Sequence, residues 1–215
     1  MTVLKELDTG GIGYLQAFAG TSRWYWASDY ASGDLYEAEE LFRDGHPIDR
    51  NRLLLVSYPE GRVEEPIKAE AGQYFGRPAY FEGRIVLPLA DFRQRTLRLP
   101  AFDCESGSLS ELALIDLSEV RDCYNLLLHT SPLMLSRQGG EGSFQIVWPE
   151  RAEFAIGPHE SFDFREGDRL YFARWYEDPD YREEVVVRRF PDGEIVDCFP
   201  GVIQTMPEGE RWHLR

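Results

Sequence analysis

One hairpin pattern recurs four times along the chain, and it limits the folds open to this sequence. In each copy an apolar strand ends near an aromatic residue, a turn follows, and a second strand begins. Four aromatic residues mark the copies: Tyr58, Phe102, Trp148 and Phe190. They lie 44, 46 and 42 residues apart. Because such regular spacing is typical of repeat architectures, we expect the markers to occupy equivalent, buried positions in successive repeats.

Two further strand-like runs precede each marker, so every repeat holds four strands. The first runs are residues 24–26, 79–81, 124–128 and 162–164, and the second runs are residues 35–42, 85–92, 133–136 and 170–176. Turn pairs such as Glu82-Gly83 separate the strands. Residues 35–42 come nearest to a helical period. Acidic residues interrupt their apolar positions, however, and we expect a strand there.

Repeats of this length with four strands resemble the blades of a β-propeller. The resemblance implies an all-β fold: a five-bladed β-propeller with four-stranded antiparallel blades, forming a single domain over residues 1–215. Five blades leave 43 residues for each. The last blade is closed by N- and C-terminal strands, with a hairpin at 2–15 paired to strands at 202–206 and 211–214. A four- or six-bladed propeller and a β-sandwich are the alternatives, because no WD40 or kelch signature is present.

Composition fits a folded domain of strands and narrows the choice of partners. Hydrophobic residues make up 43% and aromatic residues 13% of the chain, which disfavours disorder and favours strands. A formal net charge of −15 repels phosphate and anionic lipid, so we expect neither a nucleic-acid nor a membrane partner. The N-terminus does not resemble a secretory signal, and we expect a cytoplasmic protein. Three widely spaced cysteines predict neither a disulfide framework nor a zinc site.

Loops at one mouth of the predicted propeller combine aromatic, basic and histidine residues. Aromatic faces beside Arg and His side chains suit a sugar or a peptide, and loops commonly carry binding function. The predicted ligand-binding residues are Tyr74, Arg77, Arg121, His159, His46 and Tyr181. We expect the first four to approach one another from loops between blades. Each residue alone also fits an ordinary solvated loop of an acidic protein.

The strands expected to line the channel carry several carboxylates. Asp29, Glu82, Asp163 and Glu166 lie on or beside the first strand of a repeat, and glycosidases use two carboxylates about 5–10 Å apart. Glu82 and Glu166 each precede a glycine, however, which is typical of turn residues. The other residues expected to line the channel are Trp24, Trp26, Tyr80, Asn125 and His129.

Motifs of common enzyme classes are absent from the sequence. It contains no GxSxG, HExxH or P-loop motif, and its four histidines lack metal-ligand spacing. We therefore favour a non-enzymatic module that binds a protein or a small molecule, including a carbohydrate, with no metal and no cofactor. A glycosidase that uses the channel carboxylates is the alternative.

Overall fold

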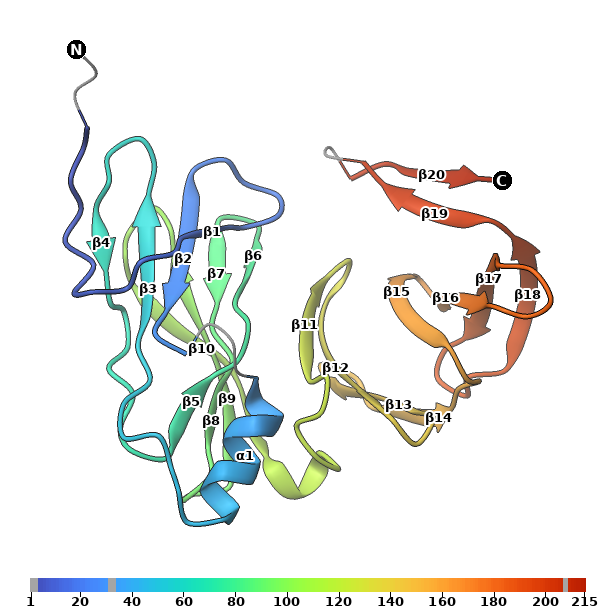
Figure 1. Cartoon of the computed structure of the whole chain (residues 1–215), viewed down its shortest axis with the longest axis horizontal. Coiled ribbons are helices and arrows are strands. Elements are labelled where there is room, and N and C mark those ends of the chain that lie inside the picture. Colours follow the sequence, from blue (N-terminus) through green and yellow to red (C-terminus); the bar gives the residue numbers. More distant parts are fainter. Residues whose placement is uncertain (1–3, 31–33, 207–208) are drawn as a thin grey trace. The chain divides into compact units, whose positions relative to one another are not determined.

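The computed structural model describes residues 4–30, 34–206 and 209–215 (Figure 1). It is all-β, with several four-stranded antiparallel sheets, which confirms the predicted fold class at this level. The chain forms two compact units, unit 1 (residues 1–121) and unit 2 (residues 122–215). The single domain over residues 1–215 stays a prediction.

Sheet A of unit 1 is a meander of four antiparallel strands. These are β1 (Gln16–Ala17), β2 (Trp24–Ser28), β3 (Leu53–Ser57) and β4 (Val63–Glu64). All five residues of β3 are buried. Both faces of this strand are covered, because Leu53 and Leu55 belong to one apolar cluster and Leu54 belongs to another. A continuous apolar run is the pattern expected of a strand buried on two sides.

Helix α1 (Leu35–Arg43) lies where the sequence predicts the second strand of the first repeat, so that prediction is wrong. The carboxylate of Asp34 caps the helix by accepting a hydrogen bond from the N–H of Glu37 at 2.8 Å. Leu35 and Ala38 are buried, three residues apart. The neighbouring acidic residues break a strand-like period of two but fit a helix, whose buried stripe recurs every three or four residues.

Sheet B of unit 1 departs from the predicted four-stranded repeat. Its six strands are β5 (Gln73–Phe75), β6 (Ala79–Phe81), β7 (Arg84–Val86), β8 (Leu89–Asp91), β9 (Thr96–Asp103) and β10 (Leu109–Asp116). The first half of β9 pairs with β8 and its second half with β7, while β10 occupies its other edge. Pro88 separates β7 from β8, since proline has no N–H to donate to a ladder. A short 3-10 helix, η1 (Leu117–Glu119), follows β10.

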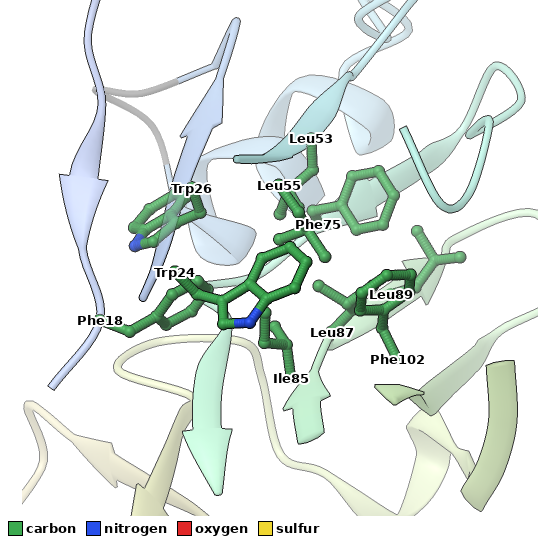
Figure 2. Packing of buried hydrophobic residues seen from close by; sticks show 10 residues of the cluster. All are labelled: Phe18, Trp24, Trp26, Leu53, Leu55, Phe75, Ile85, Leu87, Leu89 and Phe102. Atoms are coloured by element: carbon green, nitrogen blue, oxygen red, sulfur yellow. The ribbon is translucent and has the colours of Figure 1, made fainter. Parts of the chain in front are cut away.

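The main core of unit 1 joins side chains from sheets A and B (Figure 2). Trp24 and Phe102 meet edge to face, with ring centroids 5.6 Å apart. Burying a large apolar side chain stabilises a fold by roughly 1.5–3 kcal/mol relative to leaving it exposed. Trp24 and Trp26, which we expected to line a channel, are therefore core residues, 6% and 8% exposed.

Unit 2 contains two four-stranded meanders in simple chain order. Sheet C holds β11 (Leu127–Thr130), β12 (Leu133–Gly139), β13 (Ser143–Trp148) and β14 (Ala152–Ala155), and sheet D holds β15 (Glu160–Glu166), β16 (Arg169–Tyr176), β17 (Arg182–Arg189) and β18 (Ile195–Pro200). Their shared core centres on Phe144, whose ring lies against Phe154, Phe162 and Phe172 at 5.0–5.5 Å. All four marker hairpins predicted from the sequence are present, as β3–β4, β9–β10, β13–β14 and β17–β18.

Three of these hairpins close with the same turn, and its glycine is the feature that repeats. Gly61, Gly107 and Gly193 each donate a backbone hydrogen bond of 2.7–2.9 Å to the carbonyl four residues earlier. Their φ angles are +68°, +71° and +71°, a left-handed conformation that favours glycine. They lie 46 and 86 residues apart, and 86 is two repeats of 43.

The marker aromatic residues are not equivalent, so the prediction that they share one buried position is wrong. Tyr58 and Phe190 begin the shared turn, whereas Phe102 lies inside β9 and Cys104 begins the turn there. Tyr58 is 59% exposed and Phe102 is 2% exposed. The exposure of each aromatic side chain therefore depends on its local packing, whereas the left-handed backbone of the turn requires a glycine.

The predicted closure of one blade by both termini is wrong for the described residues. Residues 4–15 form no strand, and β19 (Val202–Thr205) and β20 (Arg211–Leu214) make a sheet of two strands. The N-terminal segment packs on sheet A instead, where Ile12 is buried with Ala27 and Leu54. Two glycines in a left-handed conformation, Gly10 and Gly11, interrupt its extended course. Residues 2 and 3 of the predicted hairpin lie outside the described residues.

Candidate functional site

The six predicted ligand-binding residues differ in their exposure. Tyr74 is fully buried, and its hydroxyl accepts a hydrogen bond from the N–H of Ile48 at 2.9 Å, so it serves the core of unit 1. Burial raises the pKa of this tyrosine. The other five side chains are exposed: His46, Arg77 and Arg121 in unit 1, and His159 and Tyr181 in unit 2. Because they are divided between the two units, their convergence on one site stays a prediction.

Both exposed candidates of unit 2 have partners of their own. The ring of His159 lies 4.1 Å from the ring of Trp175. The hydroxyl of Tyr181 donates a hydrogen bond to Glu183 at 2.7 Å. These contacts fix the two side chains on the surface of sheet D.

Residues expected to line a channel have structural partners. Asp29 accepts the backbone N–H of Arg52 at 2.7 Å, and Glu82 occupies the β6–β7 turn with φ +46°. His129 lies within 2.8 Å of the Ser136 hydroxyl. Desolvation lowers the pKa of His129 to about 4, so the imidazole is neutral at pH 7.

A groove of about 520 Å³ in unit 2 holds the best-supported candidate site. Two arginines, Arg165 and Arg211, lie on its walls together with Glu150. The remaining lining residues are Ser131, Pro132, Leu133, Met134, Pro149 and Gly167. The groove thus combines apolar lining residues with guanidinium groups, the mixture that orients a ligand in protein binding sites.

Arg165 is held in place by contacts on several sides. Its backbone N–H donates to the carbonyl of Ser131 at 3.0 Å, which joins β15 to the β11–β12 turn. Its guanidinium lies 3.9 Å from the ring centroid of Phe190. The side chain donates to the Gly167 carbonyl at 2.8 Å and to Glu150 at 2.5 Å. Arg165 therefore has a fixed position in the lining of the groove, and the carboxylate of Glu150 neutralises most of its charge.

Arg211 differs from Arg165 because no polar group of the described residues pairs with its side chain. Its guanidinium lies 3.7 Å from the centroid of Phe164, whose ring is stacked on Tyr171 at 4.3 Å. Within the described part of the chain it makes no side-chain hydrogen bond or ion pair, and its Nε is buried without a partner. Desolvation raises the pKa of nearby Asp163, and the charge of Arg211 opposes that rise.

A second polar cluster in unit 2 surrounds Glu160, and its members satisfy one another's hydrogen bonds. The carboxylate of Glu160, with no exposed surface, accepts hydrogen bonds from Arg188 at 3.0 Å and Arg174 at 3.2 Å. Arg174 also pairs with Glu184, which accepts a hydrogen bond from the Cys198 thiol at 2.8 Å. Desolvation and Glu184 raise the pKa of Cys198, which disfavours the reactive thiolate. This cluster stabilises sheet D.

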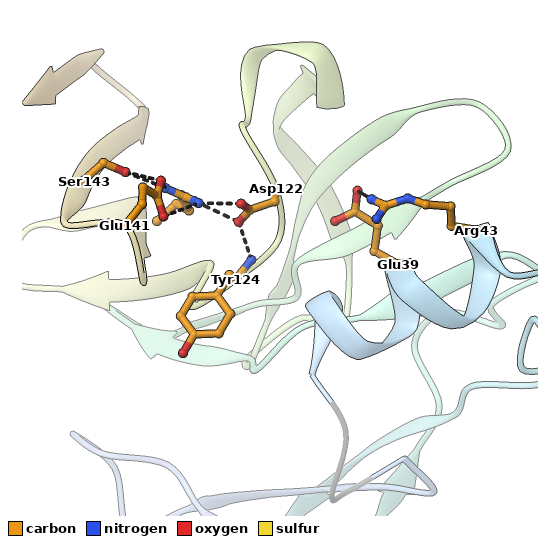
Figure 3. A network of polar contacts seen from close by, with 7 residues as sticks. Glu39, Arg43, Asp122, Tyr124, Glu141 and Ser143 are labelled. Carbon is orange, nitrogen blue, oxygen red and sulfur yellow. Dashed lines mark hydrogen bonds and ion pairs between the residues drawn. The ribbon is translucent and has the colours of Figure 1, made fainter.

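A third polar network surrounds Arg137, which is 1% exposed. Figure 3 shows Asp122, Glu141 and Ser143 pointing toward one another, and all three accept hydrogen bonds from its guanidinium. Hydrogen bonds from Arg137 and Ser143 hold the pKa of Glu141 at about 2. Because Asp122 begins unit 2 and Ser143 lies on β13, the network ties the start of the unit to sheet C.

Figure 3 also draws a separate ion pair, between Glu39 and Arg43 of helix α1 in unit 1.

Arg165 and Arg211 were not among the residues predicted from the sequence. Arg165 follows Phe164 in a strand and Arg211 precedes Trp212, so arginines beside aromatic residues were a weak signal. The rings that they stack on, Phe190 and Phe164, are distant in sequence, and only the fold identifies them.

Among the described residues, no three His, Cys, Asp or Glu side chains form a group that could hold a metal ion. Over the same ranges, no helix is long and apolar enough to cross a membrane. Neither a scan against models of known protein families nor a search of curated proteins found a match to this chain.

Proposed function

We propose that this protein is a non-enzymatic binding module whose ligand, a peptide or small molecule, occupies the Arg165–Arg211 groove. The observation that carries the proposal is Arg211, a cation at an open groove whose side chain makes no hydrogen bond or ion pair with the described residues. Hydrogen bonds to charged groups contribute about 1.5–3 kcal/mol. An acceptor on the ligand gains such a bond without displacing one that Arg211 already makes with the described residues, which favours binding at this position.

The groove has the rigidity that a binding site needs. Stacking on Phe190 and Phe164 orients both guanidinium groups before a ligand arrives, so less side-chain entropy is lost on binding. The glycosidase alternative has less support, since two of its four carboxylates, Asp29 and Glu82, already serve the backbone and a turn. The arrangement of the sheets as propeller blades stays a prediction, and the proposal does not depend on it.

A selection experiment tests the proposal without assuming a ligand. The full chain is immobilised and presented with a displayed random peptide library and with a glycan array. We expect hits whose binding is lost in Arg211→Gln and weakened in Arg165→Gln. The control is Arg62→Gln, on a groove of about 460 Å³ in unit 1, which leaves binding unchanged. Hits that are insensitive to both groove variants contradict the proposal.

A further inference from the structure

We infer that the groove binds an acidic peptide segment, with one Asp or Glu carboxylate of the peptide on Arg211 and apolar neighbours against the apolar lining residues. The inference rests on the proposed function and specifies its ligand. Three features of the groove carry it: the free guanidinium, the local charge balance and the apolar lining.

The free guanidinium matches a carboxylate in geometry. A planar guanidinium can donate two parallel hydrogen bonds to a carboxylate, the strongest neutralising contact available to it. Phe164 covers one face of the Arg211 guanidinium, and cation–π stacking of this kind leaves the donor edges for a ligand in the plane. The Nε itself is buried, so a peptide carboxylate would bind the guanidinium through its two terminal nitrogens.

The charge balance of the lining selects a monoanion. Arg165, Arg211 and Glu150 together carry a net charge of +1. The ion pair between Arg165 and Glu150 leaves Arg211 as the one cation of the lining without an ion pair among the described residues, although its charge also acts on the nearby, partly desolvated Asp163. A single carboxylate neutralises that charge. A phosphate carries nearly two negative charges at pH 7. After pairing with Arg211 it keeps about one negative charge, which the exposed carboxylate of Glu150 repels.

The apolar part of the lining favours a peptide over a free carboxylic acid. Pro132, Leu133 and Pro149 lie beside the arginines and offer surface to the side chains that flank the acidic residue. Burial of such surface contributes roughly 25 cal/mol per Å². The combination therefore recognises a carboxylate in an apolar context, which a peptide segment provides.

The net charge of −15 does not prevent this recognition. At physiological ionic strength charges beyond about 8 Å are largely screened, whereas the contact with Arg211 is made at hydrogen-bonding distance. The overall charge slows the approach of acidic peptides at low salt and leaves the local pairing intact.

Three matched peptide pools test the inference by fluorescence anisotropy with the full chain. Each is a fluorescein-labelled pool of sequence Gly-Xaa-Xaa-Glu-Xaa-Xaa-Gly, where Xaa is Ala, Leu, Pro or Val, with blocked ends. The second pool has Gln and the third phosphoserine in place of Glu. We expect the Glu pool to bind at least about tenfold more tightly than either other pool, the value of one charge-assisted contact.

Variants connect this preference to Arg211. Arg211→Gln should abolish the difference between the Glu and Gln pools, and Arg62→Gln should preserve it. Arg211→Lys, which keeps the charge without the planar fork, should retain part of the difference even if the Gln variant disturbs the β19–β20 hairpin. Equal binding of the Glu and Gln pools, tighter binding of the phosphoserine pool, or no binding of any pool overturns the inference. Where the displayed selection still gives ligands sensitive to Arg211→Gln, the proposed function survives that failure.

Discussion

Units 1 and 2 both bury polar side chains beneath antiparallel sheets, but they satisfy them with different partners. In unit 1, Asn51 and Asp91 are buried. Apart from a 3.4 Å hydrogen bond from Asn51 to Asp29, their hydrogen bonds are to neutral groups such as backbone N–H and the Gln73 amide. In unit 2 the buried Arg137, Glu160 and Arg188 are satisfied mainly by opposite charges. A buried charge depends on its partner far more than a neutral group does, so unit 2 should be the more sensitive to single charge changes and to pH.

The largest expected effect comes from Glu160→Gln. The variant keeps the size of the side chain but leaves Arg188 and Arg174 without their shared anion, and removing one partner of a buried pair costs about 3–5 kcal/mol. We expect the free energy of opening that hydrogen exchange reports for the amides of β16 and β17 to fall by that amount. The value for β3 in unit 1 should be unchanged. The control is Glu194→Gln, an exposed pair with Arg189, which should cost less than about 1 kcal/mol. Equal effects of the two variants would contradict the expected difference between the buried and the exposed ion pair.

The next effect is a pH dependence that His129 of unit 2 contributes. The folded pKa of His129 is about 4, against 6.5 for the ordinary side chain, so the unfolded state binds the proton first as pH falls. Its contribution to stability is complete above pH 6.5 and is lost as pH falls toward 4, by up to about 3 kcal/mol.

Denaturant unfolding at pH 7.0 and 4.5 measures that loss in the wild type and in His129→Gln. The variant should lose less stability between the two pH values than the wild type. His46→Gln, at an exposed position of unit 1, is the control and should behave as the wild type. An unchanged pH dependence in His129→Gln shows that other groups cause it.

A smaller effect is expected for the neutral network of unit 1. Asn51→Ala removes the acceptor of the buried Phe75 N–H, a hydrogen bond of 2.6 Å, and an unsatisfied buried donor costs about 1–3 kcal/mol. Ser28→Ala removes a 3.4 Å contact to the same side chain and a 3.1 Å hydrogen bond from the Tyr30 N–H, and should cost less. Denaturant midpoints followed in unit 1 compare the two, and a loss for Asn51→Ala above that of Glu160→Gln reverses the comparison between the units.

The smallest effect tests the helix that the sequence pattern misidentified. Asp34→Ala removes the cap of α1 and should destabilise it by about 1 kcal/mol, whereas Asp34→Asn preserves the cap. Hydrogen exchange of residues 38–43 reports the difference. If the alanine variant protects these amides as well as the wild type, packing of Leu35 and Ala38 alone determines the helix.

Sheet D shows what the sequence could predict. Its second strand was expected at residues 170–176 and lies at Arg169–Tyr176, because alternating side chains and flanking turn residues define it locally. The arrangement of sheet B could not be predicted from the sequence. The division of the expected strand at Pro88 into β7 and β8, and the pairing of both with β9, depend on contacts between distant residues. The groove lay beyond prediction for the same reason, since Arg211 becomes a site only by its contact with Phe164, 47 residues away in the sequence.

Binding of a ligand in the Arg165–Arg211 groove of unit 2 can be tested by amide chemical-shift mapping of the full chain with a ligand from the displayed selection. We expect the largest shifts at residues 131–134, 149–150, 165–167 and 211, and small shifts in the unit 1 groove at residues 62–64 and 105–107. Largest shifts in unit 1, or at the exposed His159 and Tyr181 with none in the groove, would contradict it.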